Sequence, residues 1–343
     1  MSARGPVWFT RCPVPTAFSI AVATGGLPQR LADLGVDFQS LATSRDASTR
    51  TAHFTQAQPR STRHGGNIPP IVATSRGARL AIVGLSVAPS RAALLTLPSS
   101  GIASPQDLRG KTIGVPKRVN DPVDFWRASV LQGAQRAVQA AGLGPDDVTF
   151  RDIIVDRTFV AESTRATGST STLWDAGFML GFQRAEIEAL FRGEVDAIFS
   201  EGSNRVVTQA ITGAVPVVEV GESSHTDPAL SSNLRPLTLT VSRDLLEDDP
   251  DVVAAIVEET SAAARWAGDN AAGSARILAA EAGIPEELVI PSFSPTLTSE
   301  LDIDLTPARL NLLDSQIRFL HDNGFLDGPV DVADLVEPTA LTV

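Results

Sequence analysis

The sequence has a single cysteine, few lysines and no long apolar run. Because Cys12 has no partner in the chain, an internal disulfide is impossible and a secreted, disulfide-stapled fold is excluded. Lysine occurs only as Lys111 and Lys117, and no cluster of basic residues is present. No stretch approaches the roughly 18 apolar residues of a transmembrane helix, so we expect no membrane partner. Residues 1–24 lack the basic start and unbroken apolar stretch of a signal peptide, which predicts a cytoplasmic protein.

The composition is that of an acidic globular protein. The chain has 343 residues, of which 43% are hydrophobic and 20% charged. A chain of this length exceeds the usual size of one hydrophobic core, so two domains are predicted. The formal net charge of -12 should repel nucleic acid, and we expect no nucleic-acid partner. No apolar surface stripe is evident in the pattern, so we expect a monomer.

Short apolar runs alternate with longer helical patterns along the whole chain. Strands are predicted by the runs at 6–10, 36–42, 80–85, 92–97, 148–155, 197–200 and 215–220, and another region begins at 236–241. Helices are predicted at 15–25, 129–141, 183–192, 250–267 and 306–323, and the polar stretch 43–51 is interpreted as a loop.

This alternation predicts an α/β fold whose sheets are mainly parallel. We expect two lobes with a ligand cleft between them, and the second lobe inserted into the first. Lobe I is predicted to comprise 1–108 and 226–343, and lobe II 109–225. The segment 162–172, rich in Ser, Thr and Gly, is predicted to be a mobile loop over the cleft.

Cys12 stands between a predicted strand and a predicted helix. A sulfur near a helix N-terminus meets partial positive charge, which favours the nucleophilic thiolate. The alternative is that Cys12 is simply a small buried hydrophobic residue.

A second group of candidates follows between residues 53 and 70. Arg63 precedes the pair Gly65-Gly66, which we expect to open a helix; exposed backbone N–H groups and a planar guanidinium would together bind an anion. His53 lies ten residues before Arg63, after a polar loop, and is a further candidate. A surface arginine, a flexible turn and a structural loop histidine are the alternatives. No spacing of His, Cys, Asp or Glu indicates a metal site, and no phosphate-binding or dinucleotide-binding motif is present.

Together these segments resemble the active-site segments of 2'-hydroxybiphenyl-2-sulfinate desulfinases, the last enzymes of dibenzothiophene desulfurisation. The resemblance is dense over residues 8–71 and thinner but collinear beyond. It rests on Cys12-Pro13-Val14-Pro15, His53-Phe54-Thr55, Gln58-Pro59, Thr62-Arg63, Gly65-Gly66 and Ile68-Pro69-Pro70, followed by Asp124-Phe125-Trp126-Arg127 and Gly193-Glu194-Val195-Asp196-Ala197.

The resemblance implies a periplasmic-binding-protein-like fold of type II and a cofactor-independent hydrolase that cleaves an aryl carbon–sulfur bond. The substrate would be a small aromatic sulfinate and the products sulfite and the arene. It implies Cys12, His53 and Arg63 as catalytic residues. The substrate-binding residues that it implies are Gly65, Gly66, Gln58, Phe54 and Trp126.

Two questions of mechanism and two other functions stay open at this point. Cys12 could attack the sulfur or donate a proton to the ring carbon, and the identity of the arylsulfinate is not predicted. The first alternative function is a solute-binding protein of the sulfonate, nitrate or taurine uptake type. The second is a pyrimidine-precursor synthase of the thiamine pathway, which shares the fold but uses other His and Cys patterns.

Overall fold

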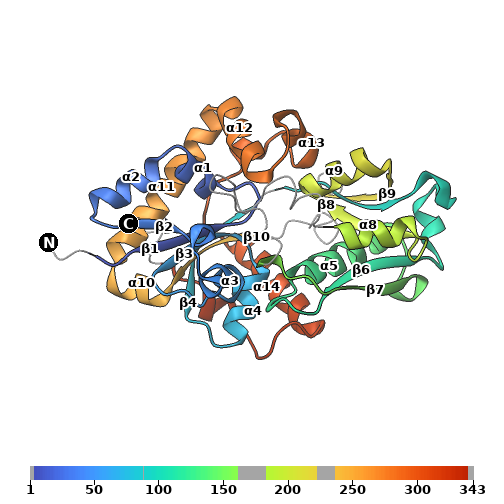
Figure 1. Cartoon of the computed structure of the whole chain (residues 1–343), viewed down its shortest axis with the longest axis horizontal. Coiled ribbons are helices and arrows are strands. Elements are labelled where there is room, and N and C mark those ends of the chain that lie inside the picture. Colours follow the sequence, from blue (N-terminus) through green and yellow to red (C-terminus); the bar gives the residue numbers. More distant parts are fainter. Residues whose placement is uncertain (1–3, 88, 161–182, 222–235, 339–343) are drawn as a thin grey trace. The chain divides into compact units, whose positions relative to one another are not determined.

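The computed structural model describes residues 4–87, 89–160, 183–221 and 236–338 (Figure 1). The chain divides into two compact units, each with its own five-stranded sheet. The first unit comprises Met1–Ala88, Arg235–Ala282 and Thr296–Val343, and the second comprises Pro89–Leu234 and Gly283–Pro295. The predicted loop at 162–172 and the predicted boundary at 225/226 lie outside the described residues.

The sheet of the first unit has the order β2-β1-β3-β10-β4. Its strands are β1 (Val7–Arg11), β2 (Phe38–Ser40), β3 (Ser61–Gly66), β4 (Leu80–Val87) and β10 (Pro236–Ser242). Strand β1 is parallel to β2 and β3, whereas β10 runs antiparallel to β3 and β4. Because β1 and β3 are parallel neighbours, the residues that follow them lie side by side at the carboxyl ends of the two strands.

Two groups of helices pack around this sheet. One contains α1 (Ala17–Ala23), α2 (Gly26–Asp33) and α11 (Pro250–Asp269), and the other contains α3 (Ala47–Thr55), α4 (Ile68–Ser75) and α14 (Pro307–Asp322) (Figure 1). The remaining helices are α10 (Arg243–Asp248), α12 (Ala271–Ala282) and α15 (Val332–Leu335). The predicted loop at 43–51 is wrong in its second half, because Asp46 caps α3 by accepting a hydrogen bond from the Ser48 amide.

The sheet of the second unit has the order β7-β6-β8-β5-β9. Its strands are β5 (Ala92–Thr96), β6 (Thr112–Arg118), β7 (Thr149–Val155), β8 (Ala197–Glu201) and β9 (Val215–Val220). Strand β6 is parallel to both neighbours, and β5 is the one reversed strand among these five. We expected β5 in the first lobe; it lies in the second unit because it is hydrogen-bonded to β8 and β9.

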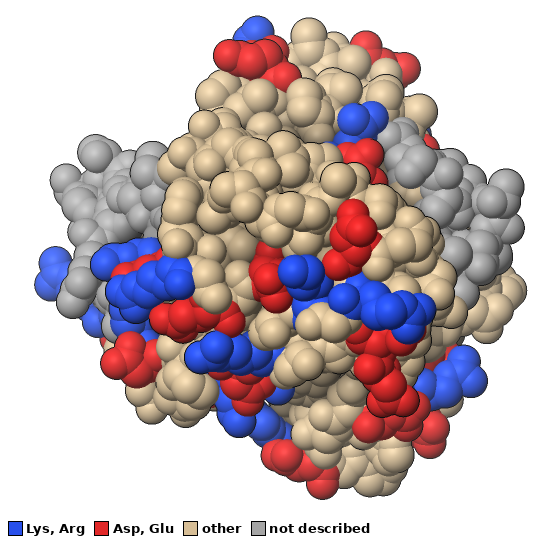
Figure 2. Space-filling view, turned by 90° about the vertical axis from the view of Figure 1, so that its right-hand side faces the viewer, with Lys and Arg blue, Asp and Glu red and all other residues tan. Residues whose placement is uncertain are grey.

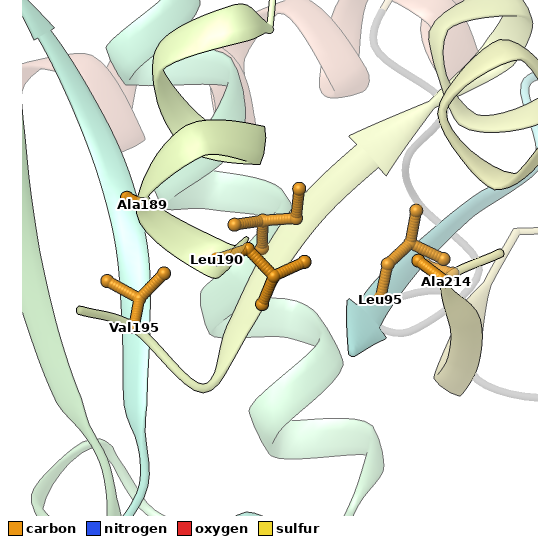
Figure 3. Packing of buried hydrophobic residues seen from close by; sticks show 7 residues of the cluster. Leu95, Ala189, Leu190, Val195 and Ala214 are labelled. Atoms are coloured by element: carbon orange, nitrogen blue, oxygen red, sulfur yellow. The ribbon is translucent and has the colours of Figure 1, made fainter. Parts of the chain in front are cut away.

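Helices cover both faces of this second sheet. They are α5 (Phe125–Ala140) and α8 (Arg184–Phe191), with α9 (Gly202–Thr212) and α13 (Val289–Ser292) packed against each other. A buried cluster joins α8 to the sheet, as Figure 3 shows for Leu95, Ala189, Leu190, Val195 and Ala214. Ile198 of β8 belongs to this cluster. The next side chain of β8, Phe199, points to the opposite face of the sheet and packs on α5. The predicted α/β fold with mainly parallel sheets is thereby confirmed.

Candidate functional site

Cys12 follows the last residue of β1 and lies beside the end of β3. The register pairs Arg11 with His64, and the Cys12 amide donates a hydrogen bond to the His64 carbonyl oxygen at 3.3 Å. The next residue of β3 is Gly65, and a Cβ there would stand 2.3 Å from the Cys12 Sγ. The sulfur therefore occupies the space that any other side chain at position 65 would need.

Arg63 brings positive charge to that sulfur from inside the unit. Its side chain is buried, its Nη2 donates to Cys12 Sγ at 3.0 Å, and its Nη1 donates to the Gly66 carbonyl oxygen at 2.8 Å. Burial lowers the pKa of Arg63 from its ordinary value, and the interaction with Cys12 opposes that decrease. The Nε of Arg63 is buried and has no hydrogen-bond partner among the described residues. The guanidinium thus stabilises negative charge on the sulfur, and its Nε is a further donor without a partner among the described residues.

His53 reaches the same sulfur from the last turn of α3. Its Nε2 lies 3.6 Å from Cys12 Sγ, and its Nδ1 lies 2.7 Å from Thr10 Oγ1. Burial, and then the charge of Arg63, hold the pKa of His53 well below its ordinary 6.5. The imidazole is therefore neutral at neutral pH, with one ring nitrogen that donates and one that accepts.

Thr10 completes this cluster, and sequence reasoning missed it. Side chains two apart in a strand point the same way, so Thr10 lies on the same side of the chain as Cys12. Its hydroxyl is buried against the imidazole and fixes the orientation of the ring. A threonine in a strand is ordinary; only the two-residue spacing from Cys12 could have indicated it.

The glycine pair does not open a helix as predicted. Gly65 and Gly66 are the last residues of β3 and pair with Thr238 and Leu237 of β10. Helix α4 begins only at Ile68. The strand continues through the two glycines because β10 pairs with both of them. The absence of a Cβ at Gly65 leaves room for the sulfur of Cys12. A Cβ at Gly66 would meet nothing within 4 Å, so open space lies beside that residue.

The other predicted binding residues lie in different surroundings. Phe54 is buried, and its ring stands edge-on to His53 with centroids 4.6 Å apart. Gln58 lies in the loop before β3, where its side chain donates to the Pro59 carbonyl oxygen. Trp126 belongs to the second unit, where its Nε1 donates to Glu186 at 2.7 Å. The structure thus assembles Cys12, His53 and Arg63 with Gly65 and Gly66.

A metal site does not form in the described part of the chain. No group of three or more His, Cys, Asp or Glu there could hold a metal ion, and no helix there is long and apolar enough to cross a membrane. The arrangement instead supplies a polarised sulfur, a neutral imidazole and a buried cation within contact distance of one another. These groups can carry out nucleophilic or proton-transfer chemistry on an anionic substrate.

Comparison with solved structures defines the class of fold. The chain matches the periplasmic aliphatic sulphonate binding protein SsuA from Escherichia coli with a TM-score of 0.65 and 17% identity, covering 97% of each chain. This likeness and the two mainly parallel sheets make the protein periplasmic-binding-protein-like, of type II.

Within that class the chain is similar to a particular enzyme. It is 26% identical to the 2'-hydroxybiphenyl-2-sulfinate desulfinases of Rhodococcus erythropolis and Rhodococcus qingshengii, over 98% of this chain and 93% of theirs. It also matches a crystal structure of a cysteine-to-serine variant of the desulfinase DszB in complex with biphenyl-2-sulfinic acid. That match has a TM-score of 0.78 and 26% identity, and it covers 99% of this chain and 98% of that one. The resemblance to the desulfinases is confirmed.

The NMT1/THI5-like family matches residues 66–164. That region begins after Cys12, His53 and Arg63. The match therefore does not cover these three residues.

Proposed function

We propose that this protein is an aryl sulfinate desulfinase that replaces the aryl carbon–sulfur bond with a carbon–hydrogen bond and releases sulfite. The observation that carries the proposal is the contact of Cys12 Sγ with both Arg63 Nη2, at 3.0 Å, and His53 Nε2, at 3.6 Å. The similarity to the desulfinases over nearly the whole chain supports the same conclusion. The reaction consumes water, so the enzyme acts as a hydrolase on a carbon–sulfur bond.

Arg63 binds the sulfinate group in this proposal. A sulfinate carries one negative charge over two oxygens, which suits a planar guanidinium. The Nη2 donor that meets Cys12 Sγ at 3.0 Å lies where these oxygens would be held. The Gly66 carbonyl oxygen accepts from Arg63 Nη1 at 2.8 Å, which holds the guanidinium in place beside Cys12. The reacting sulfur is then held against Cys12.

Two routes use these groups, and both balance. In the first, the Cys12 thiolate attacks the sulfinate sulfur, a sulfur–sulfur bond forms, and the aryl group leaves with the proton that the thiol gave up through His53. Water then cleaves the sulfur–sulfur bond and gives sulfite and the free thiol. In the second, the Cys12 thiol protonates the ring carbon, sulfur dioxide departs, and its hydration gives sulfite.

The neutral imidazole of His53 serves either route. It can accept the thiol proton at Nε2, while Thr10 Oγ1 at 2.7 Å holds Nδ1. Arg63 stabilises the thiolate that both routes produce at some stage. The first route requires a transient adduct of Cys12 with sulfur dioxide, which rapid quenching and peptide mass spectrometry would detect.

The primary test is release of sulfite from 2'-hydroxybiphenyl-2-sulfinate and from benzenesulfinate. We expect sulfite and the arene in equal amounts, and no turnover by Cys12→Ser with an unchanged circular dichroism spectrum. Arg63→Lys should raise KM, because a point charge replaces a two-pronged donor. Absence of sulfite from every arylsulfinate, with the protein folded, would contradict the proposal.

The solute-binding alternative makes a different prediction for the same samples. A pure binding protein would be thermally stabilised by sulfonates or sulfinates without turnover. Binding alone needs no proton carrier beside a polarised sulfur, yet His53 is held there by Thr10. For this reason we favour catalysis.

A further inference from the structure

The surroundings of Cys12 also suit an oxidised form of the same residue. Cys12 is partly exposed, and the buried guanidinium of Arg63 donates to its sulfur at 3.0 Å. The side chain of Arg63 is 2% exposed, and its Nε has no hydrogen-bond partner among the described residues. The guanidinium is therefore a fixed cation with unmet donor capacity, directed at the sulfur.

We propose that Cys12 is an oxidation site for peroxides whose product, a cysteine sulfinate, is held by Arg63 in the position that the proposed function assigns to the substrate's sulfinate. The inference rests on the proposed function for its consequence, which is that the oxidised enzyme blocks its own anion site. The oxidation itself rests only on the chemistry around Cys12.

Each step of this oxidation balances. The thiolate sulfur attacks one oxygen of hydrogen peroxide, a sulfur–oxygen bond forms, the oxygen–oxygen bond breaks, and water leaves with the displaced oxygen. This gives the sulfenate, with sulfur oxidised by two electrons and peroxide reduced. A sulfenate is normally captured by a second thiol, but Cys12 is the only cysteine in the chain. A second peroxide therefore converts it in the same way to the sulfinate, and a second water leaves.

The geometry favours a stop at the sulfinate. A sulfinate on Cys12 carries the charge and the two oxygens that Arg63 is placed to bind, so further oxidation has to act on a neutralised and hydrogen-bonded group. Gly65 leaves no room for a group on its own side of the sulfur, since even a Cβ there would stand 2.3 Å from Sγ. The new oxygens must therefore lie away from Gly65.

The first experiment treats the full chain with stepwise equivalents of hydrogen peroxide and follows Cys12 by peptide mass spectrometry. Cleavage after Arg11 and Arg30 releases residues 12–30, which contain Cys12 and no methionine or tryptophan. Every oxygen added to this peptide is therefore on Cys12. We expect the form with two added oxygens to accumulate, to resist dithiothreitol, and to match the fractional loss of sulfite release.

Two results of this experiment would overturn the proposal. One is a Cys12 that stays a thiol while free cysteine in the same tube is oxidised. The other is passage to three added oxygens without accumulation of two. The mass measurement needs no turnover, so it distinguishes this inference from the proposed function. Sulfinate on Cys12 of a protein that releases no sulfite would leave the oxidation standing and the desulfinase proposal refuted.

A second experiment tests the blocked anion site without peroxide. Cys12→Asp places a permanent carboxylate beside Arg63, and Cys12→Asn is its neutral match in shape. We expect benzenesulfinate to raise the melting temperature of Cys12→Asn and to leave that of Cys12→Asp unchanged. Equal stabilisation of both variants would contradict occupation of the site by a negative group at position 12. If benzenesulfinate stabilises neither variant nor the parent, the anion site itself is refuted, and the inhibitory consequence with it.

Discussion

At the scale of single residues, the two adjacent glycines at the end of β3 have opposite surroundings. A Cβ at Gly65 would lie 2.3 Å from Cys12 Sγ and 2.8 Å from Cys12 Cβ, whereas one at Gly66 would meet nothing within 4 Å. Neither glycine has the positive φ that would exclude alanine on backbone grounds. The same substitution at the two positions therefore separates steric conflict with Cys12 from a general effect on the strand.

We predict that Gly65→Ala lowers kcat/KM at least about 100-fold and destabilises the protein by about 1–3 kcal/mol, because the sulfur must move away from Arg63 and His53. The free energy of unfolding of Gly66→Ala should lie within about 0.5 kcal/mol of the parent's, since the added methyl group enters open space. Urea unfolding and sulfite release check both variants. A Gly65→Ala protein as stable and active as the parent would show that the sulfur is not confined as described.

Thr10 is a positioning residue for His53, and its substitution should affect kcat more than KM. In Thr10→Val the buried Nδ1 of His53 loses its hydroxyl partner at 2.7 Å, which weakens control of the ring. Because a misplaced imidazole transfers the Cys12 proton less well, we expect kcat to fall about 10–100-fold with little change in KM. Thr10→Ser should restore most of the rate, because it keeps the hydroxyl. Failure of Ser to restore what Val removes would assign Thr10 a purely packing role.

The candidate residues differ in how well the sequence predicts them. The short segments around Cys12, His53 and Arg63 that resemble the desulfinases predicted these residues. The structure brings the three side chains together. Thr10 was missed because its role depends on the contact between α3 and β1, which are far apart in the chain. The steric reason for glycine at 65 depends on the parallel register of β1 and β3, which no local pattern reveals.

At the scale of elements, His64 of β3 links its strand to β4 across the intervening β10. Its ring is buried, and its Nε2 lies 3.0 Å from Ser86 Oγ. Burial, and then the charge of Arg63, lower the pKa of His64 from 6.5 to about 3. The unfolded chain therefore binds a proton at position 64 between pH 6.5 and about 3, while the folded protein does not.

Stability must then fall as the pH decreases through this window, since the unfolded state binds more protons there. One such histidine contributes at most about 1.4 kcal/mol per pH unit. We predict that His64→Gln reduces the slope of the unfolding free energy against pH by up to this amount, leaving the contribution of His53. Urea unfolding between pH 4 and 7 measures the slope. An identical slope in the variant would show that His64 is protonated in the folded state.

Helix α5 packs on β8 through a glycine. A Cβ at Gly133 would lie 2.1 Å from Phe199 Cζ, so Gly133→Ala should destabilise the protein by about 1–3 kcal/mol despite the better helix propensity of alanine. Gly268→Ala in the last turn of α11 is the matched control, because its nearest neighbour would be Thr298 O at 4.0 Å. We expect the control to be neutral or stabilised by up to about 1 kcal/mol. Denaturant unfolding measures the change in unfolding free energy of both variants. Equal changes would contradict the packing of Gly133 against Phe199.

The elements themselves were largely predictable, whereas their grouping was not. Apolar runs and capping residues located most strands of both sheets and helices such as α11 and α14. Strand β3 was missed because its sequence, STRHGG, has no apolar run. Helix α3 was partly missed because its sequence, ASTRTAHFT, is polar and rich in threonine, so it lacks a strong apolar periodicity. The assignment of β5 depends on its antiparallel pairing with β8 and β9, which lie about a hundred residues further along the chain.

At the scale of the whole molecule the net charge is -12, yet on the face that Figure 2 shows acidic and basic side chains lie next to one another. Exposed large apolar side chains occur on several elements, with Ile154 and Val119 among them. That the protein is a monomer stays a prediction. Strand β7 pairs with β6 alone among the described strands and is therefore a sheet edge, where another molecule can add a strand.

Charged residues protect that edge. Arg151 Nη2 lies 3.9 Å from Glu194 Oε2. The carboxylate of Asp152 forms two ion pairs, with Arg127 Nη1 at 2.7 Å and with Lys117 Nζ at 3.2 Å. Their removal leaves a run of β-branched residues beside the exposed Ile154, which is typical of strands that pair between molecules.

We predict a single 36.1 kDa species for the parent by size exclusion with light scattering, and concentration-dependent association of the double variant Arg151→Val, Asp152→Val. The matched control is Asp314→Val, Arg318→Val, which removes an exposed ion pair of α14 and leaves the net charge the same. We expect the control to remain monomeric, because a helix surface offers no unpaired backbone groups to a neighbour. A parent protein that is already dimeric, or equal association of both variants, would show that the charges on β7 are not what keeps the molecules apart.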